Sequence, residues 1–120
     1  MRPLLAALAL TVLAAQEAHA ADSRPFEPIG GSTVSLTCDA TGEVATLTEA
    51  GTSLLLTNVG STEVHVLTGD SDQVDADVPA DMPLLPESQN IITRPRSHTH
   101  ISCKTASGTS VLRATSGNGI

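Results

Sequence analysis

Aromatic residues are almost absent from this 120-residue sequence, in which Phe26 stands alone with no Trp and no Tyr. Proteins that bind sugars or single-stranded nucleic acid commonly stack the ligand on aromatic rings, so the sequence disfavours both kinds of binding. A hydrophobic core must then be built from aliphatic side chains. These bury less area than rings do, and each stabilises the fold less.

Positive charge is also scarce, with 6 Lys and Arg against 13 Asp and Glu and a formal net charge of −7. A negative field of this size repels the phosphate backbone, so we expect no nucleic-acid partner. The same charge favours solubility.

The longest apolar run, residues 4–15, has about a dozen residues, whereas a membrane-spanning helix needs about 20. It follows Arg2 and precedes Ala18-His19-Ala20, a small-x-small pattern typical of a signal peptidase site. We therefore expect residues 1–20 to be a cleaved signal helix and the protein to be secreted or periplasmic, without a permanent membrane anchor. Residues 21–31 are predicted to be an extended arm or linker, and residues 32–120 one domain.

Cysteine occurs only twice, as Cys38 and Cys103. An exported chain enters an oxidising compartment, so we predict a disulfide between them. In the loop-entropy model a bond between residues as far apart in the sequence as Cys38 and Cys103 stabilises the fold by about 4 kcal/mol. Two buried free thiols are the alternative.

Apolar and polar residues alternate along much of the remaining chain, which is typical of β-strands. Strands are expected at residues 33–38, 43–48, 53–57, 63–68, 73–78, 90–93, 99–105 and 110–115. Glycines nine residues apart separate several of these segments, and we interpret them as turns of successive hairpins. The prediction is an all-β fold, a small antiparallel β-sandwich of about seven to eight strands, jelly-roll-like or Ig-like.

Two groups of residues could bind a metal. His98 and His100 stand at strand spacing, and His65 could join them if its strand lies alongside, which would suit zinc or copper. Asp70 and Asp72 match the first positions of an EF-hand calcium loop, but the later oxygen ligand and the glycine are missing. Surface histidines and a solvated acidic loop are the simpler interpretations. We therefore expect no cofactor and assign no residue as a metal ligand.

No arrangement typical of an enzyme is present. Serine and threonine are abundant but form no nucleophile elbow, and the two cysteines are accounted for by each other. We therefore expect no catalytic residue. Arg94 and Arg96 flank Pro95 in a basic corner that could hold an anionic group.

Several turn-and-strand segments resemble small β-rich accessory proteins of tailed phages and prophages, namely residues 28–32, 55–61, 80–86, 90–92, 99–101 and 106–117. The resemblance covers most of the predicted mature chain. It implies a head-decoration or tail-associated subunit that packs against copies of itself or a shell.

We therefore expect a non-catalytic structural or interaction domain that acts through protein–protein contacts. Its partner would be a further copy of this chain, as a homo-oligomer, or a larger assembly. The alternative is an exported ligand- or metal-binding module, whose ligand is a metal ion or an anionic group at Arg94 and Arg96.

Overall fold

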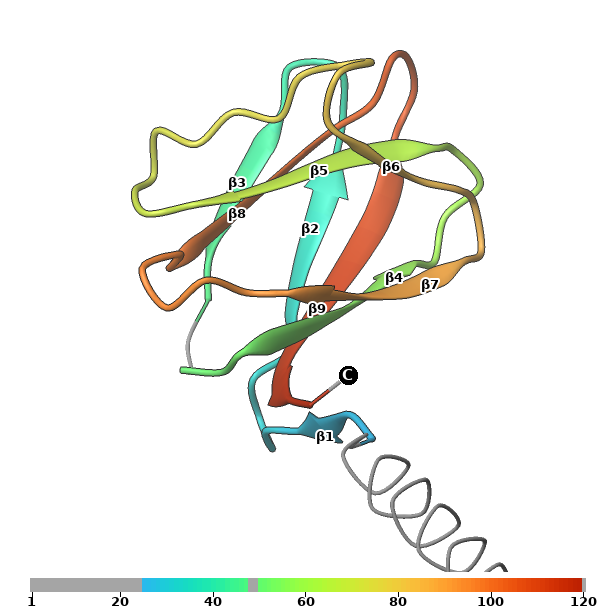
Figure 1. Cartoon of the computed structure of the whole chain (residues 1–120). Helices are drawn as coiled ribbons and strands as arrows, with labels where there is room; N and C mark the ends of the chain where they lie inside the picture. Colours follow the sequence, from blue (N-terminus) through green and yellow to red (C-terminus); the bar gives the residue numbers. More distant parts are fainter. Residues whose placement is uncertain (1–24, 48–49, 120) are drawn as a thin grey trace, which may run out of the picture.

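The computed structural model describes residues 25–47 and 50–119, so the predicted signal peptide lies outside the described residues. The regular structure there is entirely β, with nine strands in two antiparallel sheets that pack face to face (Figure 1). The prediction of an all-β sandwich is confirmed, with more strands than expected.

Sheet A is organised around its longest strand, β9 (Ser110–Asn118). β2 (Val34–Cys38) and the short β1 (Glu27–Pro28) pair with successive parts of one side of β9. On the other side of β9 lie β4 (Ser53–Asn58) and then β7 (Gln89–Thr93), which ends the sheet. β1 comes from the segment predicted to be an arm.

Sheet B has four strands in the order β3 (Glu43–Thr46), β8 (His100–Lys104), β5 (Val64–Gly69) and β6 (Met82–Leu84). In both sheets together, β2 pairs with β9, β3 with β8, β4 with β7 and β5 with β6. This nested pairing of early with late strands is the jelly-roll topology.

The chain crosses from one sheet to the other at most of its connections. Of the described strands, only β5 and β6 pair with their neighbour in sequence, so the predicted series of hairpins is wrong. Of the regularly spaced glycines, four lie between strands, whereas Gly69 ends β5 and Gly117 lies within β9. Gly42 has a φ of 93°, a left-handed conformation that favours glycine.

Asp39 shapes the turn that carries the chain from β2 to β3. Its Oδ1 accepts hydrogen bonds from Thr41 Oγ1 at 2.7 Å and from the Gly42 N–H at 2.9 Å. The Thr41 hydroxyl, more than the backbone donors, holds the pKa of this carboxyl below its ordinary value. The folded turn therefore favours the ionised form of Asp39.

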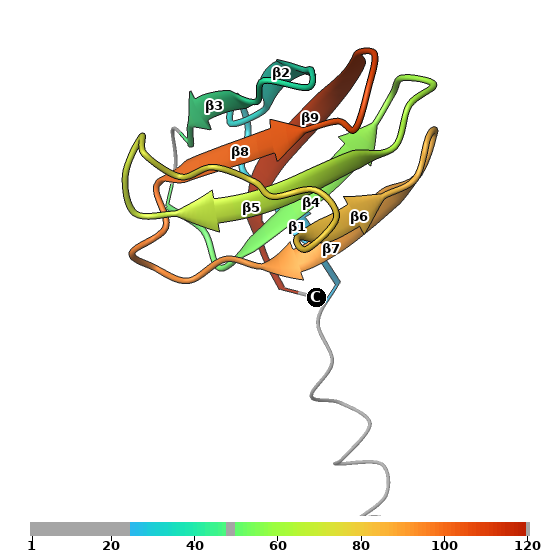
Figure 2. The ribbon, with the colours of Figure 1, turned by 90° about the horizontal axis from the view of Figure 1, so that it is seen from above.

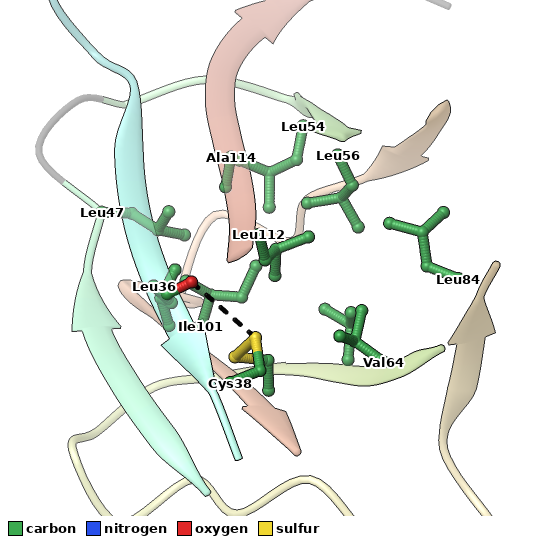
Figure 3. Close-up of a cluster of buried hydrophobic side chains, with 12 residues drawn as sticks. Leu36, Cys38, Leu47, Leu54, Leu56, Val64, Leu84, Ile101, Leu112 and Ala114 are labelled. Carbon is green, nitrogen blue, oxygen red and sulfur yellow. Dashed lines mark hydrogen bonds between the residues drawn. A yellow bond between two sulfur atoms is a disulfide. The ribbon is translucent and has the colours of Figure 1, made fainter. Parts of the chain in front are cut away.

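The core between the sheets is aliphatic, as the lack of aromatics requires. Inward-facing residues alternate along the strands, and the largest fully buried apolar side chains are Leu36, Leu54, Leu56, Val64, Ile101 and Leu112 (Figure 3).

The predicted disulfide is confirmed between Cys38 on β2 and Cys103 on β8, so it links sheet A to sheet B. Both cysteines are 0 % exposed and belong to the core. Such a bond indicates an oxidising compartment outside the cytoplasm. In the described part of the chain, no helix is long and apolar enough to cross a membrane.

The strand expected at residues 73–78 is not formed. Residues 70–81 are an irregular segment between β5 and β6, and they pack against a sheet face rather than join the ladder. The alternation of polar and apolar residues arises because Val74, Ala76 and Val78 are more buried than the polar residues between them.

Candidate functional site

Residues 70–81, here called the acidic strap, cover the outer face of sheet B, and Figure 2 shows the strap passing over β5 and β8 on its way to β6. Ala76 at its middle is fully buried, and its N–H donates to Ser102 Oγ on β8 at 2.9 Å. Asp75 Oδ1 lies 2.9 Å from Lys104 Nζ, also on β8. The strap is therefore anchored to sheet B by a buried hydrogen bond and an ion pair.

The structure separates the histidines that the sequence suggested as metal ligands. His65 is buried beneath the strap, with Nδ1 3.0 Å from the Asp81 carbonyl oxygen and Nε2 3.1 Å from Glu63 Oε1. His100 pairs with Gly69, four residues along β5 from His65, so the two histidines stand about 13 Å apart along the ladder.

His98 and His100 engage different threonines. His98 lies in the turn before β8, with its Nδ1 2.7 Å from Thr68 Oγ1. His100 begins β8, and its Nδ1 lies 2.8 Å from Thr99 Oγ1. These contacts direct the two rings to separate hydroxyl partners.

The aspartates that resemble the start of a calcium loop, Asp70 and Asp72, are exposed at the beginning of the strap. Asp72 Oδ1 accepts a hydrogen bond from Gln73 Nε2 at 3.2 Å. Within residues 25–47 and 50–119, no group of three or more His, Cys, Asp or Glu side chains could hold a metal ion.

The basic corner follows β7 and does have a hollow beside it. Arg94 is 5 % exposed; its Nε donates to the His98 carbonyl at 2.9 Å and its Nη1 to Ser116 Oγ at 3.0 Å. Burial lowers the pKa of this guanidinium from its ordinary value. A hollow of about 340 Å³ at this end is lined by Ala50, Gly51, Thr52, Arg94, Arg96 and Asn118.

The outer face of sheet A has no strap across it among the described residues, and it is almost uncharged. Its outward side chains on β2, β4, β7 and β9 and just before β2 are Thr33, Ser35, Thr37, Ser53, Leu55, Thr57, Gln89, Ile91, Thr93, Val111, Arg113 and Thr115. Arg113 is the one charge in this set. Leu55 and Ile91, paired across β4 and β7, line an open hollow of about 400 Å³ with Gln89 and Asn90.

One end of sheet A is an open edge. Even-numbered residues at β7 bond to β4, as the 2.8 Å hydrogen bond from the Arg94 N–H to the Thr52 carbonyl illustrates. Because ladder bonds alternate, Gln89, Ile91 and Thr93 direct their N–H and C=O groups away from β4. No described strand pairs on that side, and Figure 2 shows β7 at the rim of the sandwich.

The edges of sheet B are less suited to pairing. β6 contains Pro83, which has no N–H to donate, and β3 has four residues and begins with Glu43. The other edge of sheet A is formed by the two-residue β1, Glu27–Pro28, and by β2, which is uncharged but contacts β3 beside the turn that joins them. β7 is thus an uncharged, proline-free edge of five residues.

Sequence reasoning did not single out Leu55, Ile91 or the β7 edge. The signal was present in residues 89–93, which combine strand-forming residues with no charge and no proline. Whether this segment lies at the edge of a sheet or inside it depends on the jelly-roll topology, and the local pattern does not contain that information.

Fold and surface together define a disulfide-linked jelly-roll sandwich with one covered sheet and one open sheet. No family model matches the sequence, and no curated protein matches it.

Solved structures share a distant likeness with the chain. The structure of PirA is 14 % identical with a TM-score of 0.45, over 74 % of this chain and 95 % of that one. HppE with cobalt(II) and substrate is 16 % identical with a TM-score of 0.42, over 79 % of this chain and 52 % of that one. A cupin superfamily protein from Desulfitobacterium hafniense DCB-2 is 14 % identical with a TM-score of 0.39, over 75 % and 82 %. Likenesses this distant carry no argument about function.

Proposed function

We propose that this protein is an exported, non-catalytic interaction domain that binds another protein through the outer face and the β7 edge of sheet A. The observation that carries the proposal is the contrast between the sheets. The acidic strap covers sheet B, whereas sheet A offers an almost uncharged face and an edge with outward backbone donors and acceptors.

Two physical arguments support binding at this surface. A face with one charged side chain can be buried without removing many ions from water, which is the main cost of burying a charged surface. An edge strand supplies backbone hydrogen bonds to an added strand, and neighbouring side chains supply selectivity.

The disulfide supports an exported location for the interaction. A head-decoration or tail-associated subunit of phage origin is the form of this function that the sequence resemblance implies. Its partner would be a protein in either case.

Photocrosslinking in intact cells that export the protein tests the proposal. A benzophenone amino acid is introduced in place of Ile91 on sheet A or, as a matched control, in place of Leu67 on sheet B, also an outward apolar strand residue. We expect protein adducts from position 91 and few from position 67. Adducts from position 67 alone, or from neither position, would overturn the proposal.

A second candidate function is the binding of an anion in the hollow at Arg94 and Arg96. It is favoured by the concentration of charge there, because these are two of the four Lys and Arg in the described residues. Guanidinium groups suit phosphate and carboxylate ligands.

Inorganic phosphate and citrate serve as probes for this second function. At about 100 times its dissociation constant, a bound anion adds about 2.7 kcal/mol to the unfolding free energy. We expect each anion that binds to raise the melting midpoint of the wild type. The rise should be smaller in Arg96→Gln and as large as in the wild type in the control Arg113→Gln. Equal rises in all three proteins, or none in the wild type, would exclude this site.

A further inference from the structure

We infer that the partner of the β7 edge is β7 of a second copy of this chain, paired antiparallel about a two-fold axis. The inference rests on the proposed function, since it names what sheet A binds. Pairing of this kind would join the two copies of sheet A into one continuous sheet, with β7 of each copy at its centre.

The pattern of outward backbone groups suits this pairing. Gln89, Ile91 and Thr93 direct their N–H and C=O groups outward, so these three residues must face one another in the pair. The register that uses the whole strand sets Ile91 opposite Ile91 of the second copy, and Gln89 opposite Thr93. This arrangement gives about six backbone hydrogen bonds between the copies.

The side chains are self-complementary in the same register. Opposite residues of an antiparallel pair lie on the same face, so both Ile91 side chains meet on the outer face of the joined sheet. Each Ile91 already pairs with Leu55 across β4. The result is a continuous apolar stripe of Leu55, Ile91 and their two equivalents, bordered by uncharged Gln89 and Thr93.

Charges at the two ends of β7 also match. Glu87 precedes the strand and Arg96 follows it, both exposed. An antiparallel pair brings the acidic end of one copy beside the basic end of the other, so attraction at both ends opposes part of the repulsion between two chains of net charge −7. A parallel pair would set like charges together.

Sedimentation equilibrium of the purified protein over 1 µM to 1 mM measures the pairing. We expect a monomer–dimer equilibrium in which Ile91→Lys, which sets two ammonium groups opposite each other, weakens dimerisation at least tenfold. The matched control Leu67→Lys on sheet B should leave it unchanged. A wild-type protein that stays monomeric at 1 mM, or equal weakening by both variants, would overturn the inference.

A second variant tests the backbone pairing itself. Gln89→Pro removes an outward N–H and leaves the ladder to β4 intact, so the monomer should still fold, as thermal melting will show. We expect it to weaken dimerisation at least tenfold as well. An unchanged dimer would show that the copies do not join through β7.

Charge exchange gives a test of orientation. Glu87→Arg and Arg96→Glu should each weaken the dimer severalfold, and the two together should restore it. Failure of the double variant to restore the dimer would contradict the antiparallel orientation.

The mass of the adduct formed at position 91 separates this inference from the proposed function. An adduct of twice the chain mass supports self-pairing. An adduct of another mass means that a different protein adds a strand to β7, which overturns self-pairing and leaves the proposed function in place. Absence of any adduct overturns both.

Discussion

Sheet A and sheet B are built from similar strands around the same aliphatic core, yet their outer faces differ. The outer face of sheet B lies under a strap with five aspartates, whereas the outward residues of sheet A form an almost uncharged surface with one arginine. The edges differ in the same direction, since Pro83 blocks β6 and β7 has neither proline nor charge.

The difference shows how a small acidic domain can keep one associating surface. Charge and proline at strand edges discourage unwanted pairing, and covering a sheet face removes it from contact. Here a strap covers sheet B, and among the described edge strands only β2 and β7 have neither charge nor proline. The opposite sheet is left as the surface through which pairing is allowed.

The largest expected effect comes from breaking the link between the two sheets. Replacing Cys38 and Cys103 together with Ala removes the bond that joins β2 to β8, and we expect the free energy of unfolding to fall by about 4 kcal/mol. Urea denaturation of the oxidised wild type and the double variant measures the difference. A loss below about 1 kcal/mol would mean that packing of the sheets, and not the bond, holds them together.

The next effect compares one serine on each outer face. Ser102→Ala leaves the buried Ala76 N–H without its acceptor, so we expect a loss of about 2 kcal/mol and faster proteolysis of residues 70–81. Ser35→Ala on the open face of sheet A should cost less than about 0.5 kcal/mol. Equal losses would remove the distinction between a covered face and an open face.

A pH-dependent effect tests the turn between the sheets. Because the folded state lowers the pKa of Asp39, its contribution to stability is complete above the ordinary carboxyl pKa of about 4 and is lost as the pH falls through the lower folded value. Asp39→Asn does not titrate and should lose less stability than wild type below about pH 4. Urea midpoints measured from pH 7 to pH 2.5 would contradict this if both proteins declined in parallel.

The smallest effect on stability is expected for Ile91→Lys, the variant whose effect on association is large. Ile91→Lys changes an outward side chain of sheet A, so its monomer should be within about 0.5 kcal/mol of wild type. Denaturation at a concentration where the wild type is monomeric makes the comparison. A larger loss of unfolding free energy would mean that Ile91 stabilises the monomer itself.

Much of the fold was predictable from local pattern and composition. Alternation at residues 33–38 identified the buried face of β2, and two cysteines behind a predicted signal peptide predicted the disulfide. The strand predicted at residues 73–78 from the same kind of alternation was wrong, because Ala76 is buried by packing on Ser102 rather than by strand pairing.

The buried hydrogen bonds of Asn58 could not be predicted from the sequence. Asn58 is fully buried; its Nδ2 donates to the Thr62 and Leu84 carbonyls, and its Oδ1 accepts from the Gly60 N–H and Ser110 Oγ. These partners come from three segments: Gly60 and Thr62 from the connection after β4, Leu84 from β6 and Ser110 from β9. Only the jelly-roll crossings bring them together, and the same crossings decide that β7 ends a sheet.

Amide hydrogen exchange, measured by NMR in a dilute and a concentrated sample of the wild-type protein, shows directly whether the β7 edge pairs with a second copy. In the dilute sample Asn90 and Ile92, bonded to β4, should exchange slowly and Gln89, Ile91 and Thr93 quickly. We expect these three outward amides to become protected as concentration rises, while the amides of β3 and β6 do not change. Outward amides of β7 that remain fast, or new protection at the edges of sheet B, would contradict it.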